Sequence, residues 1–336
     1  MLKYFILASL TGVVIASRML SLPHDTTVPG NCLPTDRARV LRPWSQVVPG
    51  RRPMCQAPSL PSVGSMTDSP LAIVTGASRG LGHALAAGLA SAGYRLIIDA
   101  RDGEALRAAA AALRASHDLP PASVLALPGD IADCGHRADL AAAASAAGGP
   151  ALLVNNAGTL GASPLPALAD YPVAALRTAL EINLVAPLAI TQLLLPALRE
   201  AGGSVLTITS DAAVEAYAGW GGYGAAKAGL EQACHVLAAE EPAVRFWWVD
   251  PGDLRTALHQ QAFPGSDISD RPEPETVIPA FLRLIRERMP SGRYQAAELM
   301  PAVATAAAPA GPAPAGPAPA GPAPAGPAPA GPEASW

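Results

Sequence analysis

Three polar residues in the second half of the chain have the types and spacing that proton transfer to a carbonyl group requires. Tyr223 precedes Lys227 by four residues, so in a helix the two side chains share one face. The pKa of a free phenol is about 10, and a nearby cation lowers it toward the range in which a proton is readily exchanged. Ser210 ends a β-branched run at 204–210 that predicts a strand leading into a loop, where its hydroxyl would hold a carbonyl oxygen. Because Tyr-x-x-x-Lys also occurs by chance on helix surfaces, this hypothesis needs support from the rest of the chain.

A glycine-rich turn at residues 75–82 supplies that support. The apolar run 69–74 predicts a strand, Thr-Gly-Ala-Ser-Arg-Gly-Leu-Gly follows at 75–82, and a helical pattern comes next. Strand, glycine turn and helix together predict a dinucleotide-binding unit. In it Gly76 turns tightly, Gly80 lets the backbone approach a diphosphate, and Gly82 lets the helix pack on the strand. The first turn of the helix then offers free N–H groups to the anion.

Further motifs follow in order along the chain. They are Asp130, Asn-Asn-Ala-Gly at 155–158, Asn183, and Pro-Gly-Asp-Leu-Arg-Thr at 251–256. With the glycine turn and the Ser210, Tyr223 and Lys227 set, they resemble the classical short-chain dehydrogenase/reductase family from about residue 70 to residue 300. The resemblance implies a Rossmann-type α/β fold and hydride transfer between a nicotinamide cofactor and a carbonyl or alcohol.

The resemblance also implies a role for each catalytic residue. Tyr223 would be the general acid in ketone reduction and the base in alcohol oxidation. Lys227 would lower the pKa of the tyrosine and hold the nicotinamide ribose, and Ser210 would stabilise charge on the substrate oxygen. Asn183 would support a water-linked proton path to Lys227, or alternatively satisfy helix backbone.

By the same resemblance, a larger set of residues is expected to bind the cofactor. Residues 155–158 end an apolar strand and are expected to brace the sheet beside the adenosine, and the turn at 251–252 is expected to cover the nicotinamide. For Asp130, an adenine contact competes with a loop aspartate that merely faces solvent. The full set is Gly76, Ser78, Arg79, Gly80, Leu81, Gly82, Arg101, Asp130, Ile131, Asn156, Ala157, Gly158, Tyr223, Lys227, Pro251, Gly252 and Thr256.

The choice between the two nicotinamide cofactors depends on the end of the second strand, at 95–101. An acid there accepts a hydrogen bond from the ribose 2′-hydroxyl of NAD, whereas an arginine there binds the 2′-phosphate of NADP. Aligned with the family's pattern, the acid position falls on Ala100, and Asp99 lies one residue early. Arg101 and Arg79 occupy positions where the family places basic phosphate ligands. We therefore expect NADP(H) to be favoured over NAD(H). A preference for NAD would instead mean that Asp99 is the residue that binds the ribose 2′-hydroxyl.

Composition divides the 336 residues into three parts. Residues 66–300 have the size of one α/β domain. Residues 301–336 include five copies of Ala-Pro-Ala-Gly-Pro at 308–332, which predicts a disordered low-complexity tail, with a partner-binding spacer as the alternative.

The segment 1–65 is expected to be largely unstructured, because after the apolar run at 4–16 it is rich in Pro and Arg and has no periodicity. That run resembles a signal segment and is too short for a confident membrane span. Two interpretations remain: a leader or membrane tether, or translation that naturally begins at Met66. We prefer the second, since a nicotinamide reductase needs cytosolic cofactor, and expect a cytoplasmic protein without stable membrane insertion.

Charge and cysteine content bound the partners. The formal net charge is −4 and the chain has no basic run, so nucleic acid is not an expected partner. The four cysteines lie far apart, without CxxC or a Cys/His spacing, so neither a disulfide scaffold nor a metal site is expected. They are Cys32, Cys55, Cys134 and Cys234.

The alternation of apolar patterns predicts a single doubly wound parallel sheet of about seven strands flanked by helices, with disordered extensions at both ends. Strands are expected near 71–75, 95–99, 123–127, 151–155, 204–210, 244–249 and 293–297. Helices are expected near 80–92, 103–116, 136–147, 172–200, 223–241 and 276–288. Members of the resembled family pair through the helices matching 172–200 and 223–241, which implies a homodimer or homotetramer.

The substrate is not identified by the sequence. The loops expected to shape its pocket contain Leu160, Val214, Tyr217, Trp220, Leu258, Phe263 and Pro264, which predict an apolar, partly aromatic site for a small carbonyl or alcohol. Two functions remain. One is an NADPH-dependent carbonyl reductase, or the reverse alcohol oxidation; the other is a silent cofactor-binding module acting as redox sensor or scaffold. The intact catalytic set favours the enzyme.

Overall fold

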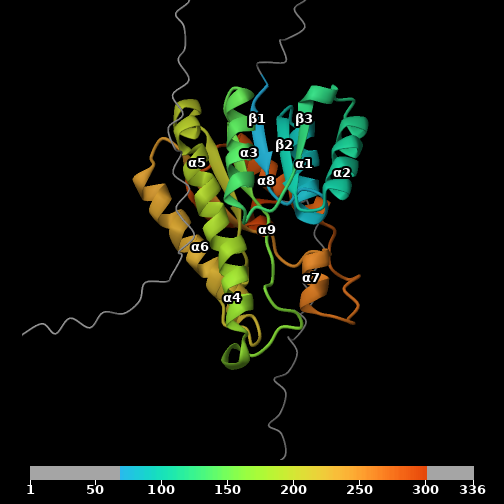
Figure 1. Cartoon of the computed structure of the whole chain (residues 1–336), viewed down its shortest axis with the longest axis vertical. Helices are drawn as coiled ribbons and strands as arrows, with labels where there is room; N and C mark the ends of the chain where they lie inside the picture. Colours follow the sequence, from blue (N-terminus) through green and yellow to red (C-terminus); the bar gives the residue numbers. More distant parts are fainter. Residues whose placement is uncertain (1–68, 301–336) are drawn as a thin grey trace, which may run out of the picture. The chain divides into compact units, whose positions relative to one another are not determined.

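The computed structural model describes residues 69–300, which form a seven-stranded parallel sheet between two layers of helices (Figure 1). The strands lie in the order β3-β2-β1-β4-β5-β6-β7. The expected single, doubly wound α/β fold is confirmed. The predictions for residues 1–65 and for the repeat tail lie outside the described residues.

The strands are β1 Leu71–Val74, β2 Arg95–Ala100, β3 Val124–Pro128, β4 Leu152–Asn155, β5 Ser204–Ile208, β6 Arg245–Asp250 and β7 Gly292–Gln295. The helices are α1 Gly80–Ser91, α2 Gly103–Ser116, α3 Cys134–Ala146, α4 Val173–Leu180, α5 Ala186–Ala201, α6 Gly221–Glu240, α7 Ala257–Ala262, α8 Ile278–Arg286 and α9 Ala296–Leu299. Five shorter helical segments connect them: Pro121–Ser123, Leu168–Asp170, Glu181–Val185, Asp211–Ala213 and Pro274–Val277.

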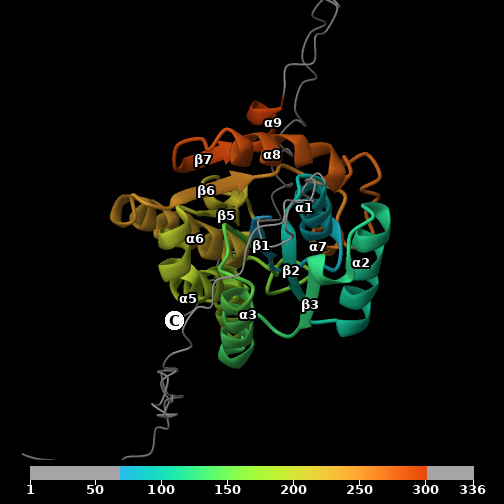
Figure 2. The same cartoon turned by 90° about the horizontal axis from the view of Figure 1, so that it is seen from above.

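Both faces of the sheet are covered, which explains why its central strands are apolar throughout. Helices α1, α2 and α8 cover one face, and α3, α5 and α6 cover the other (Figure 2). Because successive side chains of a strand point to opposite faces, β1 supplies Ala72 and Val74 to the first core and Leu71 and Ile73 to the second.

The chain reverses its direction of travel across the sheet at β1. The path from β1 through β2 to β3 runs toward one edge, and α3 then carries it back to β4 on the other side of β1. In such sheets the crevice outside the carboxyl ends of the strands, at this switch point, is where ligands bind. The residues that follow β1 and β4 are the glycine turn and the segment 156–158.

Several element boundaries differ from those expected. The long helix predicted over 172–200 is interrupted by a π-helical turn at Glu181–Val185, and it contains Asn183. The last strand ends at Gln295 and α9 follows it, where a strand to 297 was predicted. Helix α7 was not predicted, because its six residues are too few to show a helical period.

The segment Val173–Ala201 is long and apolar enough to span a membrane by length and composition. Half of its most apolar window is buried against the rest of the described chain. Packing in the protein core explains why the buried half of this segment is apolar. The other half is not buried and leaves apolar side chains on the outer surface.

Candidate active site

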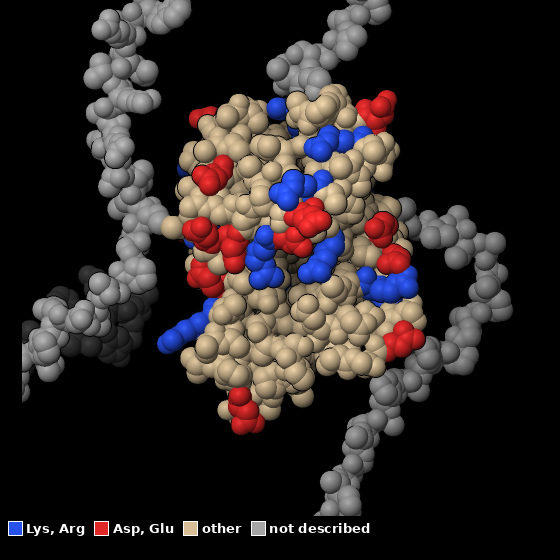
Figure 3. Space-filling view, turned by 45° about the vertical axis from the view of Figure 1, so that its right-hand side comes forward, with Lys and Arg blue, Asp and Glu red and all other residues tan. Residues whose placement is uncertain are grey.

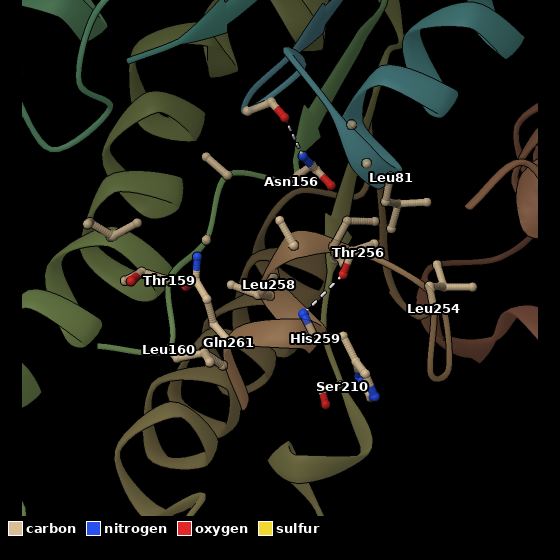
Figure 4. A pocket seen from close by; sticks show the side chains of 18 of the residues that line it. Leu81, Asn156, Thr159, Leu160, Ser210, Leu254, Thr256, Leu258, His259 and Gln261 are labelled. Atoms are coloured by element: carbon tan, nitrogen blue, oxygen red, sulfur yellow. Dashed lines mark hydrogen bonds between the residues drawn. The ribbon is translucent and has the colours of Figure 1, made fainter. Parts of the chain in front are cut away.

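A cavity of about 890 Å³ lies over the carboxyl ends of the strands at the switch point. Asn156, Leu160, Ser210 and Thr256, from four separate segments, surround one space there (Figure 4). Of the predicted site residues, the cavity wall brings together Gly76, Ser78, Arg79, Gly80, Leu81, Gly82, Arg101, Asp130, Ile131, Asn156, Ala157, Gly158, Ser210, Tyr223, Lys227, Pro251, Gly252 and Thr256. Asn183 alone among them lies behind the wall.

The glycine turn is built by close backbone contacts. A Cβ atom on Gly82 would lie 2.4 Å from both the side-chain nitrogen of Asn156 and the carbonyl oxygen of Gly76. Gly76 has φ +68° and Gly80 has φ +56°, in the left-handed region that favours glycine. A Cβ on Gly80 would meet only Thr256, at 3.6 Å, so the cavity side of this residue stays open. This is the shape that close approach of a diphosphate to the backbone requires.

The segment after β4 is fastened to the glycine turn. The hydroxyl of Thr75 accepts hydrogen bonds from the N–H groups of Asn156 and Ala157, both at 3.0 Å. The Asn156 amide donates to the Thr75 carbonyl at 2.8 Å. These bonds hold the glycine turn and the segment 156–158 against each other at the switch point.

The cavity wall near the end of β2 carries exposed side chains of both signs: the arginines Arg79 and Arg101, and the aspartates Asp102 and Asp130. Arg79 and Arg101 are exposed cavity-wall residues, and within residues 69–300 neither has an ion-pair partner. Asp99 is buried instead: its Oδ1 accepts the N–H of Gly76 at 2.8 Å, and its Oδ2 lies 3.1 Å from Nε2 of His136. Asp130 is exposed, and its carboxylate accepts the N–H of Ala132 at 2.9 Å.

The tyrosine and lysine lie together on the inner face of α6, as their spacing predicted. Nζ of Lys227 lies 5.6 Å from the centre of the Tyr223 ring and donates a hydrogen bond to the carbonyl of Ile208 at 2.7 Å. Both residues are buried and both line the cavity. The chain has only two lysines, Lys3 and Lys227, although Lys and Arg together number 23. A lysine stands where a titratable amine is useful, since arginine keeps its charge at any working pH.

The sequence predicts that Lys227 lowers the pKa of Tyr223. This prediction is wrong, because the pKa of Tyr223 is raised. Burial raises the pKa of the phenol, and the negative charges of Asp250 and Asp211 raise it further. Burial also lowers the pKa of Lys227 to about 8, because the apolar surroundings disfavour the ammonium form. Burial is thus the largest influence on the pKa of both groups, and it leaves Tyr223 protonated and makes Lys227 a group that exchanges protons near pH 8.

Ser210 lies just beyond β5, two residues after the strand ends. Its hydroxyl accepts the N–H of Ala212 at 3.2 Å and donates to the carboxylate of Asp211 at 2.9 Å. Asp211 also accepts a hydrogen bond from the phenol hydroxyl of Tyr217 at 3.0 Å. The serine is therefore held at the cavity wall by its own loop, and its one hydroxyl hydrogen is directed at Asp211.

Asn183 has a supporting position in this structure. Its side-chain nitrogen donates to the carbonyls of Thr159 at 2.7 Å and Ala179 at 2.9 Å, and its oxygen accepts the N–H of Thr159 at 3.0 Å. The side-chain amide thus uses both hydrogens to hold the loop after β4. The predicted water-linked role stays a prediction, and the π-turn that carries Asn183 is a feature frequent at functional sites.

The segment after β6 lines the cavity beside the glycine turn, where Thr256 is the side chain nearest to Gly80. Asp250 accepts the N–H of Gly252 at 3.0 Å, and the Thr256 hydroxyl accepts the N–H of His259 at 3.1 Å, which begins α7 (Figure 4). Arg293 of β7 reaches this point, donating to the Ser210 carbonyl at 3.2 Å and lying 3.5 Å from the Asp250 carboxylate.

Several cavity residues were not predicted from the sequence. Asp211, Asp250, His259 and Gln261 line the wall. Asp211 directly follows the site candidate Ser210, and Asp250 ends β6 immediately before Pro251 and Gly252, so the positions of both residues marked them. His259 and Gln261 gave no signal, because the helix that carries them was not recognised. Within residues 69–300 no group of three or more His, Cys, Asp or Glu side chains converges as a metal site.

The fold and the cavity define a Rossmann-type oxidoreductase. A family model described as short chain dehydrogenase matches residues 70–267. Because this match covers more than half of the chain, the protein belongs to the short-chain dehydrogenase family and is a nicotinamide-dependent oxidoreductase acting on CH–OH or C=O groups.

Named relatives agree with this assignment. Sepiapterin reductase of Bos taurus is 34% identical over 203 residues, covering 57% of this chain and 75% of the relative. A rhamnolipid-biosynthesis 3-oxoacyl-[acyl-carrier-protein] reductase of Pseudomonas aeruginosa is 36% identical over 181 residues, covering 51% and 66%.

Solved structures show the same fold. A short chain dehydrogenase of Shigella flexneri complexed with NADP has a TM-score of 0.63 and 28% identity, and covers 68% of this chain and 97% of that one. One from Escherichia coli complexed with NADPH has a TM-score of 0.62 and 27% identity, with 68% and 96% covered.

Proposed function

We propose that this protein reduces the carbonyl group of a small, largely apolar compound with NADPH, with Tyr223 as general acid. The observation that carries the proposal is the placing of Tyr223 and Lys227 in one cavity with the glycine turn. The named relatives are reductases, which supports reduction over alcohol oxidation as the working direction.

The cofactor's hydride would be delivered to the carbonyl carbon, and this chain's residues manage the accompanying proton. Ser210 binds the carbonyl oxygen by turning its hydroxyl hydrogen from Asp211 to that oxygen. Tyr223 donates its phenolic proton to the same oxygen as negative charge develops there, so that C=O becomes CH–OH. Lys227 then returns a proton to the phenolate. A raised pKa at Tyr223 keeps its proton in place until an alkoxide forms, which is the stronger base.

The residues on the wall fit a dinucleotide. The open face of Gly80 and the first turn of α1 suit a diphosphate, and the rim formed by Asp130 and Ile131 suits the adenine. Pro251, Gly252 and Thr256 line the same cavity as Lys227, which suits the nicotinamide end. The exposed Arg79 and Arg101, with Ala100 at the acid position, support NADP(H) over NAD(H).

The substrate end of the cavity supports an apolar ligand. Trp220 packs edge-on against Tyr223, with 5.8 Å between the ring centres, and Phe263 lies 6.2 Å beyond it. Leu168, Val173 and Val214 are exposed apolar residues that do not line the cavity, although Val214 was expected to shape the pocket. The lower part of one face carries few charged side chains, below a band of mixed charge (Figure 3). An apolar carbonyl compound gains from burial at such a site, whereas an anionic one would not.

Assembly and location are part of the proposal. Leu193 of α5 and Val236 of α6 are exposed apolar residues on the two helices expected to pair, and Val185 adds to the same outer surface. This supports a homodimer or homotetramer. A cytoplasmic location fits the need for NADPH.

The alternative is a silent cofactor-binding module that acts as a sensor or scaffold. No observation on the described residues favours it, since Ser210, Tyr223 and Lys227 all reach the cavity. The two functions are separated by mixing the protein and NADPH with a panel of aldehydes and ketones and following NADPH oxidation. Turnover that depends on the carbonyl supports the reductase; tight NADPH binding without turnover of any carbonyl would support the silent module.

A further inference from the structure

A buried aspartate lies directly behind the place where the cofactor's adenosine ribose is expected. Asp99 is 1% exposed, yet it belongs to the cavity wall with its neighbours Ala100 and Arg101. Its Oδ1 accepts the N–H of Gly76 at 2.8 Å, so the carboxylate holds the glycine turn to the end of β2. A carboxylate at this place would repel a ribose phosphate unless its charge is balanced.

His136 supplies that balance. It enters from the first turn of α3, is 7% exposed, and its Nε2 lies 3.1 Å from Oδ2 of Asp99. The ring occupies space that only a glycine leaves free, because a Cβ on Gly129 would lie 2.2 Å from the ring nitrogen Nδ1. The hydrogen bond to Asp99 raises the pKa of His136, which increases the protonated fraction at neutral pH.

This arrangement differs from that of an aspartate that binds the ribose of NAD. An aspartate that binds the 2′-hydroxyl of NAD must present its carboxylate to the ligand. Here one oxygen is taken by the glycine turn and the other by an imidazole, so the carboxylate is used within the protein. Arg79 and Arg101 stay exposed on the cavity wall, and the carboxylate of Asp99 is not presented to a ligand beside them.

We propose that His136 is a specificity-determining residue: by pairing with Asp99 it neutralises the carboxylate behind the adenosine ribose and so permits a cofactor with a 2′-phosphate. Asp99 is correspondingly a positioning residue for the glycine turn. The inference rests on the proposed function, because it concerns the cofactor of that site.

The test measures dissociation constants of NADPH and NADH for the full chain at neutral pH, by calorimetry, so that no substrate is needed. His136→Gln keeps a hydrogen-bonding side chain and removes the positive charge. It is expected to weaken NADPH binding about tenfold more than NADH binding, the size of one uncompensated charge near the phosphate. Asp99→Asn combined with His136→Gln removes both charges and is expected to restore most of the NADPH preference. Circular dichroism establishes that each variant is folded.

The outcomes are distinguishable. Equal losses for NADPH and NADH in the folded His136→Gln variant, or no recovery in the double variant, would overturn this inference and leave the proposed function standing. Should His136→Gln not fold, the folded double variant decides, since a preference for NADPH close to that of the native protein supports the inference and its loss overturns it. A native protein that binds neither dinucleotide, or binds NADH more tightly, would overturn the proposed function and this inference together.

Discussion

The amine of Lys227 donates a hydrogen bond of 2.7 Å to the carbonyl oxygen of Ile208, and so ties α6 to the end of β5. Ile208 lies two residues before Ser210, so the same bond sets the distance between the lysine's helix and the serine's loop. The catalytic set is thereby assembled by backbone as much as by side chains. A substitution at Lys227 is expected to affect both proton transfer and the position of Ser210.

The ionisation of Lys227 can be observed directly, because it is one of only two lysines. Burial lowers its pKa to about 8, so the neutral, reactive amine should appear as the pH rises through 8 rather than 10.5. Between these values the unfolded chain binds more protons than the folded one, so this group's contribution to the free energy of unfolding increases with pH. Acylation rates at Lys227 measured by mass spectrometry between pH 6 and pH 11 check this, and a midpoint near the ordinary value would contradict it.

Two glycines of α1 should respond differently to the same substitution. Gly82→Ala puts a Cβ 2.4 Å from the Gly76 carbonyl oxygen, where backbone must move, and is expected to cost about 1–3 kcal/mol and to weaken NADPH binding. Gly88→Ala puts a Cβ 2.4 Å from the Cγ2 methyl of Ile278, a side chain that does not line the cavity, so it is expected to destabilise the fold without weakening NADPH binding. Thermal unfolding and NADPH titration of both variants compare them; equal effects on NADPH binding would refute the steric account of the glycine turn.

Cofactor preference should depend on Arg101. Arg101→Ser is expected to raise the dissociation constant for NADPH about tenfold or more, the loss of a charge-assisted hydrogen bond, and to leave that for NADH nearly unchanged. Arg107→Ser serves as the control, because Arg107 lies in α2, shortly after Arg101, and does not line the cavity. If NADH binding fell equally with Arg101→Ser, the residue would not be reading a phosphate.

The proposed pairing of subunits predicts a shift in molar mass. Leu193 of α5 is 49% exposed, and a glutamate there would bury a charge in an interface formed by α5 and α6. Leu193→Glu is expected to yield single chains by size exclusion with light scattering, while the native protein yields two or four. Leu125→Glu on the edge strand β3, where the leucine is 44% exposed, should leave the assembly intact. A native protein that is already a single chain would end this proposal.

The sequence could predict the sheet and most of the cavity because their signals are local. Apolar runs mark strands that are buried on both faces, and the glycine turn has a spacing imposed by the contacts at Gly76 and Gly82. The break in the helix at Asn183 was not predicted, since a π-turn leaves the apolar pattern nearly unchanged.

Other parts of the site depend on contacts between distant residues, which a linear pattern does not show. The pairing of Asp99 with His136 joins β2 to α3, and it decides that Asp99 is turned away from the ribose. The direction of the Tyr223 pKa could not be foreseen either. Spacing showed that a cation was near, but the degree of burial, which is the largest influence on this pKa, is a property of the whole fold.

The central claim is that the phenolic proton of Tyr223 is transferred to the substrate oxygen. Tyr223→Phe removes this hydroxyl alone, and Tyr217→Phe removes the other tyrosine hydroxyl of the cavity wall as a control. With any carbonyl compound that the native protein reduces, Tyr223→Phe is expected to lower kcat by about 10²- to 10⁴-fold with NADPH affinity unchanged, and Tyr217→Phe to lower it far less. A Tyr223→Phe variant that reduces the carbonyl at the native rate would contradict the account.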